Sequence, residues 1–183
     1  MTEKLFELDS YIQSFTATVQ ECLPHGEGYA VRLDRTAFFP EGGGQGSDRG
    51  TLDNATVLDV QEVDEKILHI TDKPLLEGST VTGVIDWNRR FDFMQQHSGE
   101  HIVSGVAHSL FGCENVGFHL GEDIVTLDFD KPLTIQQILK IETLANEAVF
   151  ENREFRTYYP DNKTLSTLNY RSKKEIEGDL RIV

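Results

Sequence analysis

The stretch WNRRFDFMQQHSGEHIVSGVAHSLFG, residues 87–112, separates two halves of the chain that differ in pattern. Apolar residues recur along it at helical spacing: Phe91, Met94, Ile102, Val106 and Leu110. Gly112 follows the last of them and is a typical residue to end a helix. The stretch therefore predicts one long helix, which begins where the residues before it stop alternating.

The residues before this helix predict a set of short strands. Between residues 14 and 86, β-branched segments are separated by turn residues: SFTATVQECL (14–23), GYAVRLD (28–34), TAFF (36–39), NATVLDVQEV (54–63), KILHIT (66–71) and STVTGVID (79–86). Strands this close together are typical of a small β-barrel or sandwich. We expect residues 1–86 to form a small N-terminal β-barrel domain.

The residues after the helix predict a mixture of strands and helices. NVGFHLGEDIVTLDFD (115–130) predicts two strands joined by a turn, and residues 131–153 predict a second helix. Thr134 and Gln137 fit a capping box at its start. Its predicted apolar face consists of Ile135, Ile138, Leu139, Ile141, Leu144, Ala145 and Val149. EFRTYY (154–159) predicts a strand, NKTLSTLN (162–169) a short helical turn, and DLRIV (179–183) the start of a strand.

This order of elements predicts an α+β fold, with residues 87–183 forming a domain in which helices pack on an antiparallel sheet. No apolar run approaches the roughly 20 residues that span a bilayer, and the N-terminus lacks a signal-peptide pattern. We therefore expect a cytoplasmic protein with no membrane association. Cys22 and Cys113 have no CxxC spacing, which favours free thiols.

The net charge of −14 argues against non-specific binding to nucleic acid, because an acidic surface repels a polyanion. The charge is unevenly distributed. Residues 1–86 carry 6 Lys and Arg against 16 Asp and Glu, whereas residues 87–183 carry 11 against 15. A polyanion would therefore meet the second half more readily, and we expect Arg89, Arg90, Lys173 and Lys174 to contribute there.

Two histidines in the predicted long helix are candidate metal ligands. His97 and His101 are four residues apart, so both can reach one ion from the same helix face. Such a pair is also common in helices that bind no metal. The zinc peptidase motif HExxH has a glutamate directly after the first histidine. Here Ser98 follows His97 and Glu100 precedes His101, which disfavours a peptidase.

The segment DRTAFFPEGGGQGSDRG, residues 34–50, is the second candidate site. Three consecutive glycines add no side chain to a core and permit a tight turn with a close approach of the backbone to another group. A simple hairpin loop would explain them equally well. Thr36 and Gln45 place polar groups beside this backbone, as a selective site for a small ligand requires.

Together these motifs resemble a known family. RTAFFPEGGGQGSDRG (35–50), HSGEH (97–101) and VGFHLGEDIVTLDFD (116–130) follow one another as in the editing domain of alanyl-tRNA synthetase, and more closely as in the medium-length AlaX trans-editing proteins. The resemblance extends from about residue 14 to residue 183. The resemblance implies that the protein hydrolyses the aminoacyl ester of tRNA(Ala) that carries serine or glycine at its acceptor end. It also implies that the reaction needs no ATP and that each chain binds one Zn²⁺.

The resemblance also assigns residues. His97 and His101 match the first two zinc ligands, and His119 lies in the strand that lines the family's pocket. Glu100 stands where many synthetase domains have a small hydroxyl residue, and it is a candidate to orient or deprotonate water. The recognition motif corresponds to Thr36, Gly42, Gly43, Gly44 and Gln45. We expect Thr36 to contact the hydroxyl of a seryl substrate, and Glu100 and His119 to act in catalysis.

One family feature is missing. The family completes its zinc site with a Cys-x-x-x-His pair shortly after a strand that resembles DLRIV, and the sequence stops at Val183. Neither cysteine has a histidine at that spacing. We expect a chain truncated at its C-terminal end, with the remaining ligands beyond Val183; the alternative is an incomplete site. Two other functions stay open: a non-catalytic module that binds tRNA or an amino acid, and a metal-dependent hydrolase of small esters or amides.

Overall fold

The computed structural model describes residues 2–121, 124–168 and 182. The chain divides into two compact units. One contains residues 1–100 with 117–127, and the other contains residues 101–116 with 128–183. No helix among the described residues is long and apolar enough to cross a membrane.

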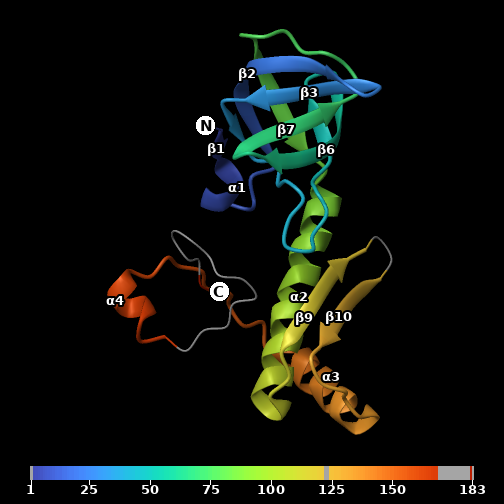
Figure 1. Cartoon of the computed structure of the whole chain (residues 1–183), viewed down its shortest axis with the longest axis vertical. Helices are drawn as coiled ribbons and strands as arrows, with labels where there is room; N and C mark the ends of the chain where they lie inside the picture. Colours follow the sequence, from blue (N-terminus) through green and yellow to red (C-terminus); the bar gives the residue numbers. More distant parts are fainter. Residues whose placement is uncertain (1, 122–123, 169–181, 183) are drawn as a thin grey trace. The chain divides into compact units, whose positions relative to one another are not determined.

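The first unit is built on six antiparallel strands whose order closes on itself (Figure 1). They are β2 (Ser14–His25), β3 (Gly28–Leu33), β5 (Gly50–Leu52), β6 (Ala55–Val63), β7 (Lys66–Thr71) and β8 (Thr80–Ile85). The order is β2-β3-β7-β6-β5-β8, and β8 pairs again with β2. Because every strand has two neighbours, this sheet has no open edge along its paired residues.

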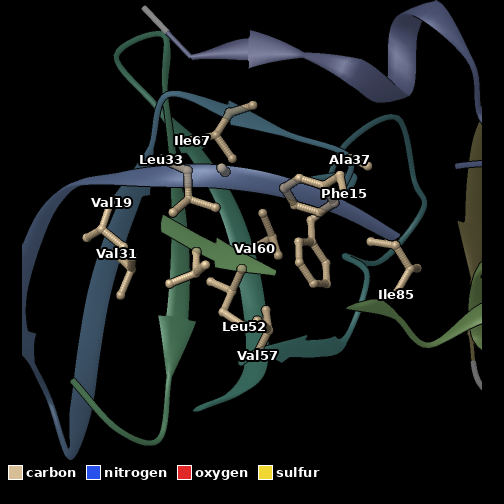
Figure 2. Packing of buried hydrophobic residues seen from close by; sticks show 13 residues of the cluster. Phe15, Val19, Val31, Leu33, Ala37, Leu52, Val57, Val60, Ile67 and Ile85 are labelled. Atoms are coloured by element: carbon tan, nitrogen blue, oxygen red, sulfur yellow. The ribbon is translucent and has the colours of Figure 1, made fainter. Parts of the chain in front are cut away.

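Alternating side chains of these strands fill the interior of the sheet (Figure 2). In β8, for example, Val81 and Ile85 are buried, while Thr82 and Val84, which alternate with the buried positions, are exposed. The buried cluster consists of Phe15, Ala17, Val19, Val31, Leu33, Ala37, Phe38, Leu52, Val57, Val60, Ile67, Val81 and Ile85. Burying each large apolar side chain contributes about 1.5–3 kcal/mol, so this cluster is the main stabilising feature of the unit.

The segment that carries the glycines is mostly irregular. β1 (Glu3–Lys4) pairs in parallel with β4 (Arg35–Thr36), and α1 (Leu5–Leu8) follows β1. The strand predicted at residues 36–39 is therefore wrong beyond Thr36. Phe38 belongs to the buried cluster inside the sheet and Phe39 is half-buried, and both lie in a loop that continues to β5.

The long helix is confirmed as α2 (Trp87–Phe111). It begins directly after Asp86, which follows β8. Gly112 ends it with φ +62°, and its N–H donates to the carbonyl of His108 at 2.8 Å. The boundary between the two compact units falls inside this helix, after Glu100.

Both predicted strands and the second predicted helix are also found. β9 (Asn115–Leu120) pairs with β10 (Val125–Phe129), and α3 (Ile135–Phe150) begins with the capping box of Thr134 and Gln137. In the second unit a small core contains Ala107, Cys113 and Ile141, with Val103, Val106, Phe111, Phe129 and Leu133 packed against it. The α+β class is confirmed. Cys22 and Cys113 are free thiols, as expected.

In the second unit the apolar face of α3 is largely exposed, and the strand predicted at residues 154–159 is wrong. Of the expected apolar face of α3, only Ile141 is buried in the described structure, while Ile135, Ile138, Leu139 and Val149 are exposed. Residues 154–159 form no strand: Tyr158 makes an isolated bridge with Ile182. The short helical turn appears as α4 (Asn162–Leu165). The predicted strand at residues 179–183 lies outside the described residues except for Ile182.

Candidate metal centre

Three potential metal ligands gather on one face of α2. His97, Glu100 and His101 each offer a ligand atom, and these atoms all lie within 4.8 Å of one another. The spacing i, i+3 and i+4 brings them together over one helical turn. His97 is half-buried, Glu100 is 6% exposed, and His101 is exposed. Two imidazole nitrogens and one carboxylate oxygen form a donor set that suits Zn²⁺.

The glycine motif forms a tight two-residue turn. The N–H of Gly42 donates to the carbonyl of Gln45 at 3.0 Å, and the N–H of Gln45 donates back to Gly42 at 3.1 Å. Between them, Gly43 and Gly44 have φ of +63° and +84°. Positive φ at both central positions is the conformation in which glycine is strongly preferred. The hairpin interpretation of the glycines is thus geometrically correct, but the turn also makes contacts beyond itself.

Gly44 makes a close backbone approach, which is one of the two interpretations that the sequence leaves open. Its carbonyl accepts the N–H of Leu120 at 2.9 Å. A Cβ atom on Gly44 would lie 2.4 Å from the carbonyl oxygen of Phe118. The backbone at Gly44 therefore lies directly against strand β9, and only glycine, which has no side chain, fits at position 44.

We expect Gly44→Ala to be more damaging than Gly43→Ala, although both positions have positive φ. Gly43 has no atom within 4 Å of a built Cβ, so its substitution pays only the backbone cost of about 1–2 kcal/mol. Gly44→Ala adds overlap with the Phe118 carbonyl, for about 1–3 kcal/mol more. Urea unfolding of the two variants measures the difference. Equal losses would show that the approach to β9 is not rigid.

Gln45 connects this turn to the candidate ligands. Its side chain is 6% exposed, and its Oε1 lies 2.9 Å from Nδ1 of His97. The ring of Phe118 lies 5.2 Å from the imidazole of His97, centroid to centroid. One predicted ligand and one residue of the predicted recognition motif are therefore in direct contact.

The residues after Gln45 are also held against α2. Arg89 donates from Nε to the carbonyl of Ser47 at 3.0 Å, and its guanidinium lies 4.4 Å from the centre of the Phe93 ring. Ser47 in turn donates to Asp59 of β6 at 2.6 Å. Burial alone would raise the pKa of Asp59, but hydrogen bonds from Ser47, Gln61 and the Val60 N–H lower it below its ordinary value.

Arg90 does not have the predicted surface role. It is 2% exposed and forms a buried ion pair with Asp48, which is fully buried. Arg89 is half-buried against Ser47 and Phe93, and Lys173 and Lys174 lie outside the described residues. The expectation that Arg90 meets a polyanion is therefore wrong, because its charge is neutralised inside the protein.

Thr36 lies inside the closed sheet, where its hydroxyl has internal partners. Its Oγ1 is 2.8 Å from Nε2 of His69, and it accepts the N–H of Phe38 at 3.1 Å. Nδ1 of His69 lies 3.0 Å from the carbonyl of Val31, which can only accept, so Nδ1 carries the proton and Nε2 accepts from Thr36. Both Thr36 and His69 have no exposed surface. Contact between Thr36 and a substrate would require this arrangement to open.

His69 was not singled out from the sequence, although the alternation in KILHIT places it on the same inward face as Ile67. Burial lowers the pKa of His69 to about 4, and its bond to the Val31 carbonyl opposes this only in part. The ordinary value is about 6.5. The histidine is therefore neutral in the folded protein at neutral pH.

We expect His69 to make stability depend on pH in a defined window. Between about pH 6.5 and pH 4 the unfolded chain binds a proton that folded His69 does not, so the free energy of unfolding falls as the pH falls. The full difference is about 3 kcal/mol. Urea unfolding at several pH values, with His69→Gln as the comparison, measures it. A variant whose stability falls as steeply as the parent's would contradict this assignment.

His119 is not grouped with the other predicted site residues. It is exposed on β9 and is not in the ligand cluster. Because successive side chains of a strand point to opposite faces, and Phe118 faces His97, His119 is directed to the other face of β9. Its predicted catalytic role stays a prediction.

Comparisons with known proteins found a matching family model and several similar sequences. Residues 7–89 match the family model described as tRNA synthetases class II (A). The chain is 41% identical over 155 residues to the alanyl-tRNA editing protein Aarsd1 of Bos taurus, covering 77% of this chain and 35% of that protein. It is 40% identical over 159 residues to Aarsd1 of Rattus norvegicus, covering 79% and 39%.

An alanine–tRNA ligase, that of Ignicoccus hospitalis, is also similar. It is 36% identical over 165 residues, which cover 86% of this chain and 18% of the ligase. The chain thus spans well under half the length of the curated relatives it matches.

Proposed function

Since this chain belongs to the AlaX-like family of alanyl-tRNA editing proteins, we propose that it hydrolyses the ester of mischarged tRNA(Ala). Seryl-tRNA(Ala) is the main proposed substrate and glycyl-tRNA(Ala) the second. The observation that carries the proposal is the cluster of His97, Glu100 and His101, in contact with the glycine motif through Gln45. Hydrolysis of an ester requires no ATP.

The donor set fits a single Zn²⁺. His97 and His101 would hold the ion through their rings, and the carboxylate of Glu100 is close enough to serve as a third ligand or to bind a water beside it. When bound, zinc lowers the pKa of a water ligand to about 7 and polarises a carbonyl. Neither Cys22 nor Cys113 belongs to the cluster of described ligands.

The residues of this chain would contribute as follows. Glu100, almost fully buried, accepts a proton from the attacking water. The water oxygen adds to the acyl carbonyl, the bond from that carbon to the ribose oxygen breaks, and the ribose oxygen takes up a proton. Serine or glycine is released together with tRNA(Ala). His101 is the exposed member of the cluster.

Selectivity for serine over alanine needs a polar contact with the seryl hydroxyl. A site that hydrogen-bonds a hydroxyl rejects an analogue lacking it by about 10⁴-fold, because its own polar groups would be left unpaired. The proposed contact through Thr36 stays a prediction, since its hydroxyl now bonds to His69 and to the Phe38 N–H. The exposed face of β9 near His119 is an alternative source of the contact.

The proposed partner is the acceptor end of tRNA(Ala), and the proposed location is the cytoplasm. The net charge of −14 makes binding through a large basic surface unfavourable. We propose that the closed sheet serves as a small β-barrel that presents the glycine motif, and that recognition is confined to the end of the tRNA.

The enzyme assignment is tested by comparing Ser-tRNA(Ala) with serine methyl ester, in the presence of zinc. Hydrolysis of the tRNA ester at a much higher kcat/KM than the methyl ester supports the proposal. Equal efficiency would favour a hydrolase of small esters. Binding of Ser-tRNA(Ala) without release of serine would favour a non-catalytic module.

A further inference from the structure

Gln45 makes a directional contact with His97. The amide oxygen Oε1, which can only accept a hydrogen bond, lies 2.9 Å from Nδ1 of the imidazole. Nδ1 must therefore be the nitrogen that carries the proton. In a neutral imidazole the other nitrogen, Nε2, then holds the lone pair.

The backbone of Gln45 is fixed by the turn that precedes it. Gln45 and Gly42 exchange two backbone hydrogen bonds of 3.0 and 3.1 Å. Gly44 is bonded to Leu120 and lies too close to the Phe118 carbonyl for any side chain. Because Gln45 is only 6% exposed, its side chain loses little conformational entropy when it binds His97.

The imidazole is fixed from a second direction. The ring of Phe118 packs on His97 at 5.2 Å between centroids, with the planes tilted by 44°. Arg89, two turns before His97 on the same helix, binds the carbonyl of Ser47, two residues after Gln45. The glycine turn is thus attached to α2 through Gln45, and the residues that follow it are attached through Ser47. Strand β9 contacts both the turn and the imidazole of His97.

We propose that Gln45 is a positioning residue that holds His97 in the tautomer with its proton on Nδ1, so that Nε2 is presented to the metal. This inference rests on the proposed metal-dependent function. It gives Gln45 a different role from the substrate contact expected from its motif. Hydrogen bonds of this kind to a ligand histidine typically change metal affinity by about 10–100-fold.

Three variants separate this role from simple packing. Gln45→Met keeps the length of the side chain and removes the acceptor, whereas Gln45→Glu keeps an acceptor oxygen at the same place. Gln96→Met is the matched control, because Gln96 is exposed on the same helix as His97. The parent and all three variants are first compared by urea unfolding, to establish that each is folded.

The first measurement is the tautomer of His97 in the metal-free protein, read from ¹⁵N–¹H correlations of the imidazole at pH 8. We expect the Nδ1–H form in the parent, in Gln45→Glu and in Gln96→Met, and a mixture of forms in Gln45→Met. An Nε2–H form in the parent would overturn the proposal, even if Gln45→Met failed to fold.

The second measurement is the affinity for zinc, by competition with a chelator. We expect the Kd of Gln45→Met to rise about 10–100-fold, with Gln45→Glu and Gln96→Met within a few-fold of the parent. A folded Gln45→Met with unchanged affinity would contradict the proposal. Neither readout uses tRNA, so a protein with the expected tautomer and affinities that hydrolyses no Ser-tRNA(Ala) would refute the proposed function and leave this inference standing.

Discussion

Asp48→Asn is expected to destabilise the protein by about 3–5 kcal/mol, the usual cost of breaking a buried ion pair from one side. Asp48 is fully buried and Arg90 is 2% exposed. Nε of Arg90 lies 3.0 Å from both carboxylate oxygens, and its terminal nitrogens donate to the carbonyls of Ser10 at 2.9 Å and Ala37 at 2.6 Å. Asparagine keeps the shape of Asp48 but leaves the buried guanidinium charge without its counter-charge.

The measurement is urea unfolding of the parent and of Asp48→Asn at pH 7. Glu151→Gln is the control, because it breaks the exposed ion pair with Arg153 and should cost less than about 1 kcal/mol. If Asp48→Asn lowered the free energy of unfolding by less than about 1 kcal/mol, the Arg90 guanidinium would not be buried beside Asp48, and the account of this ion pair would be wrong. Because this pair attaches the start of α2 to the loop before β5, the loss would also loosen the support of the glycine turn.

His97→Ala is expected to abolish both zinc binding and hydrolysis. In the variant only Glu100 and His101 remain of the three potential ligands on this face of α2. Zinc content should fall from about one per chain to near zero, because a zinc site with protein ligands normally uses three or four. Hydrolysis should be lost with the zinc, because the ion that lowers the pKa of the attacking water is no longer held.

Zinc content is measured by elemental analysis of the purified variants after dialysis, and hydrolysis by release of serine from Ser-tRNA(Ala). His25→Ala is the matched control, since His25 is an exposed histidine of β2 that does not belong to the cluster. A His97→Ala protein that keeps its zinc would place the metal elsewhere, and one that keeps its activity would remove the metal from the mechanism.

Local patterns were sufficient for the elements whose signal lies within a few residues. The apolar spacing and terminal Gly112 predicted α2, and Thr134 with Gln137 predicted the start of α3. The same spacing brought His97, Glu100 and His101 together, because i, i+3 and i+4 positions are neighbours on any helix. These features needed no knowledge of the rest of the fold.

Features that depend on distant segments could not be predicted. Nothing near Asp48 in sequence indicates that it pairs with Arg90, 42 residues away, so the sequence alone predicts a surface position for Arg90. The approach of Gly44 to Phe118 is another example: the three glycines permit a close approach of the backbone, but the sequence indicates neither that one occurs nor to which strand. Residues 154–159 had the composition of a strand, yet in the described structure only Tyr158 pairs, through one bridge to Ile182.

The most direct measurement of the central claim is the rate at which the zinc-supplied protein deacylates Ser-tRNA(Ala) and Ala-tRNA(Ala) under the same conditions. We expect rapid release of serine and a rate for alanine lower by a factor on the order of 10² or more. Equal rates for the two esters, or no release of serine from a protein with zinc bound, would contradict the assignment of this chain as an editing hydrolase.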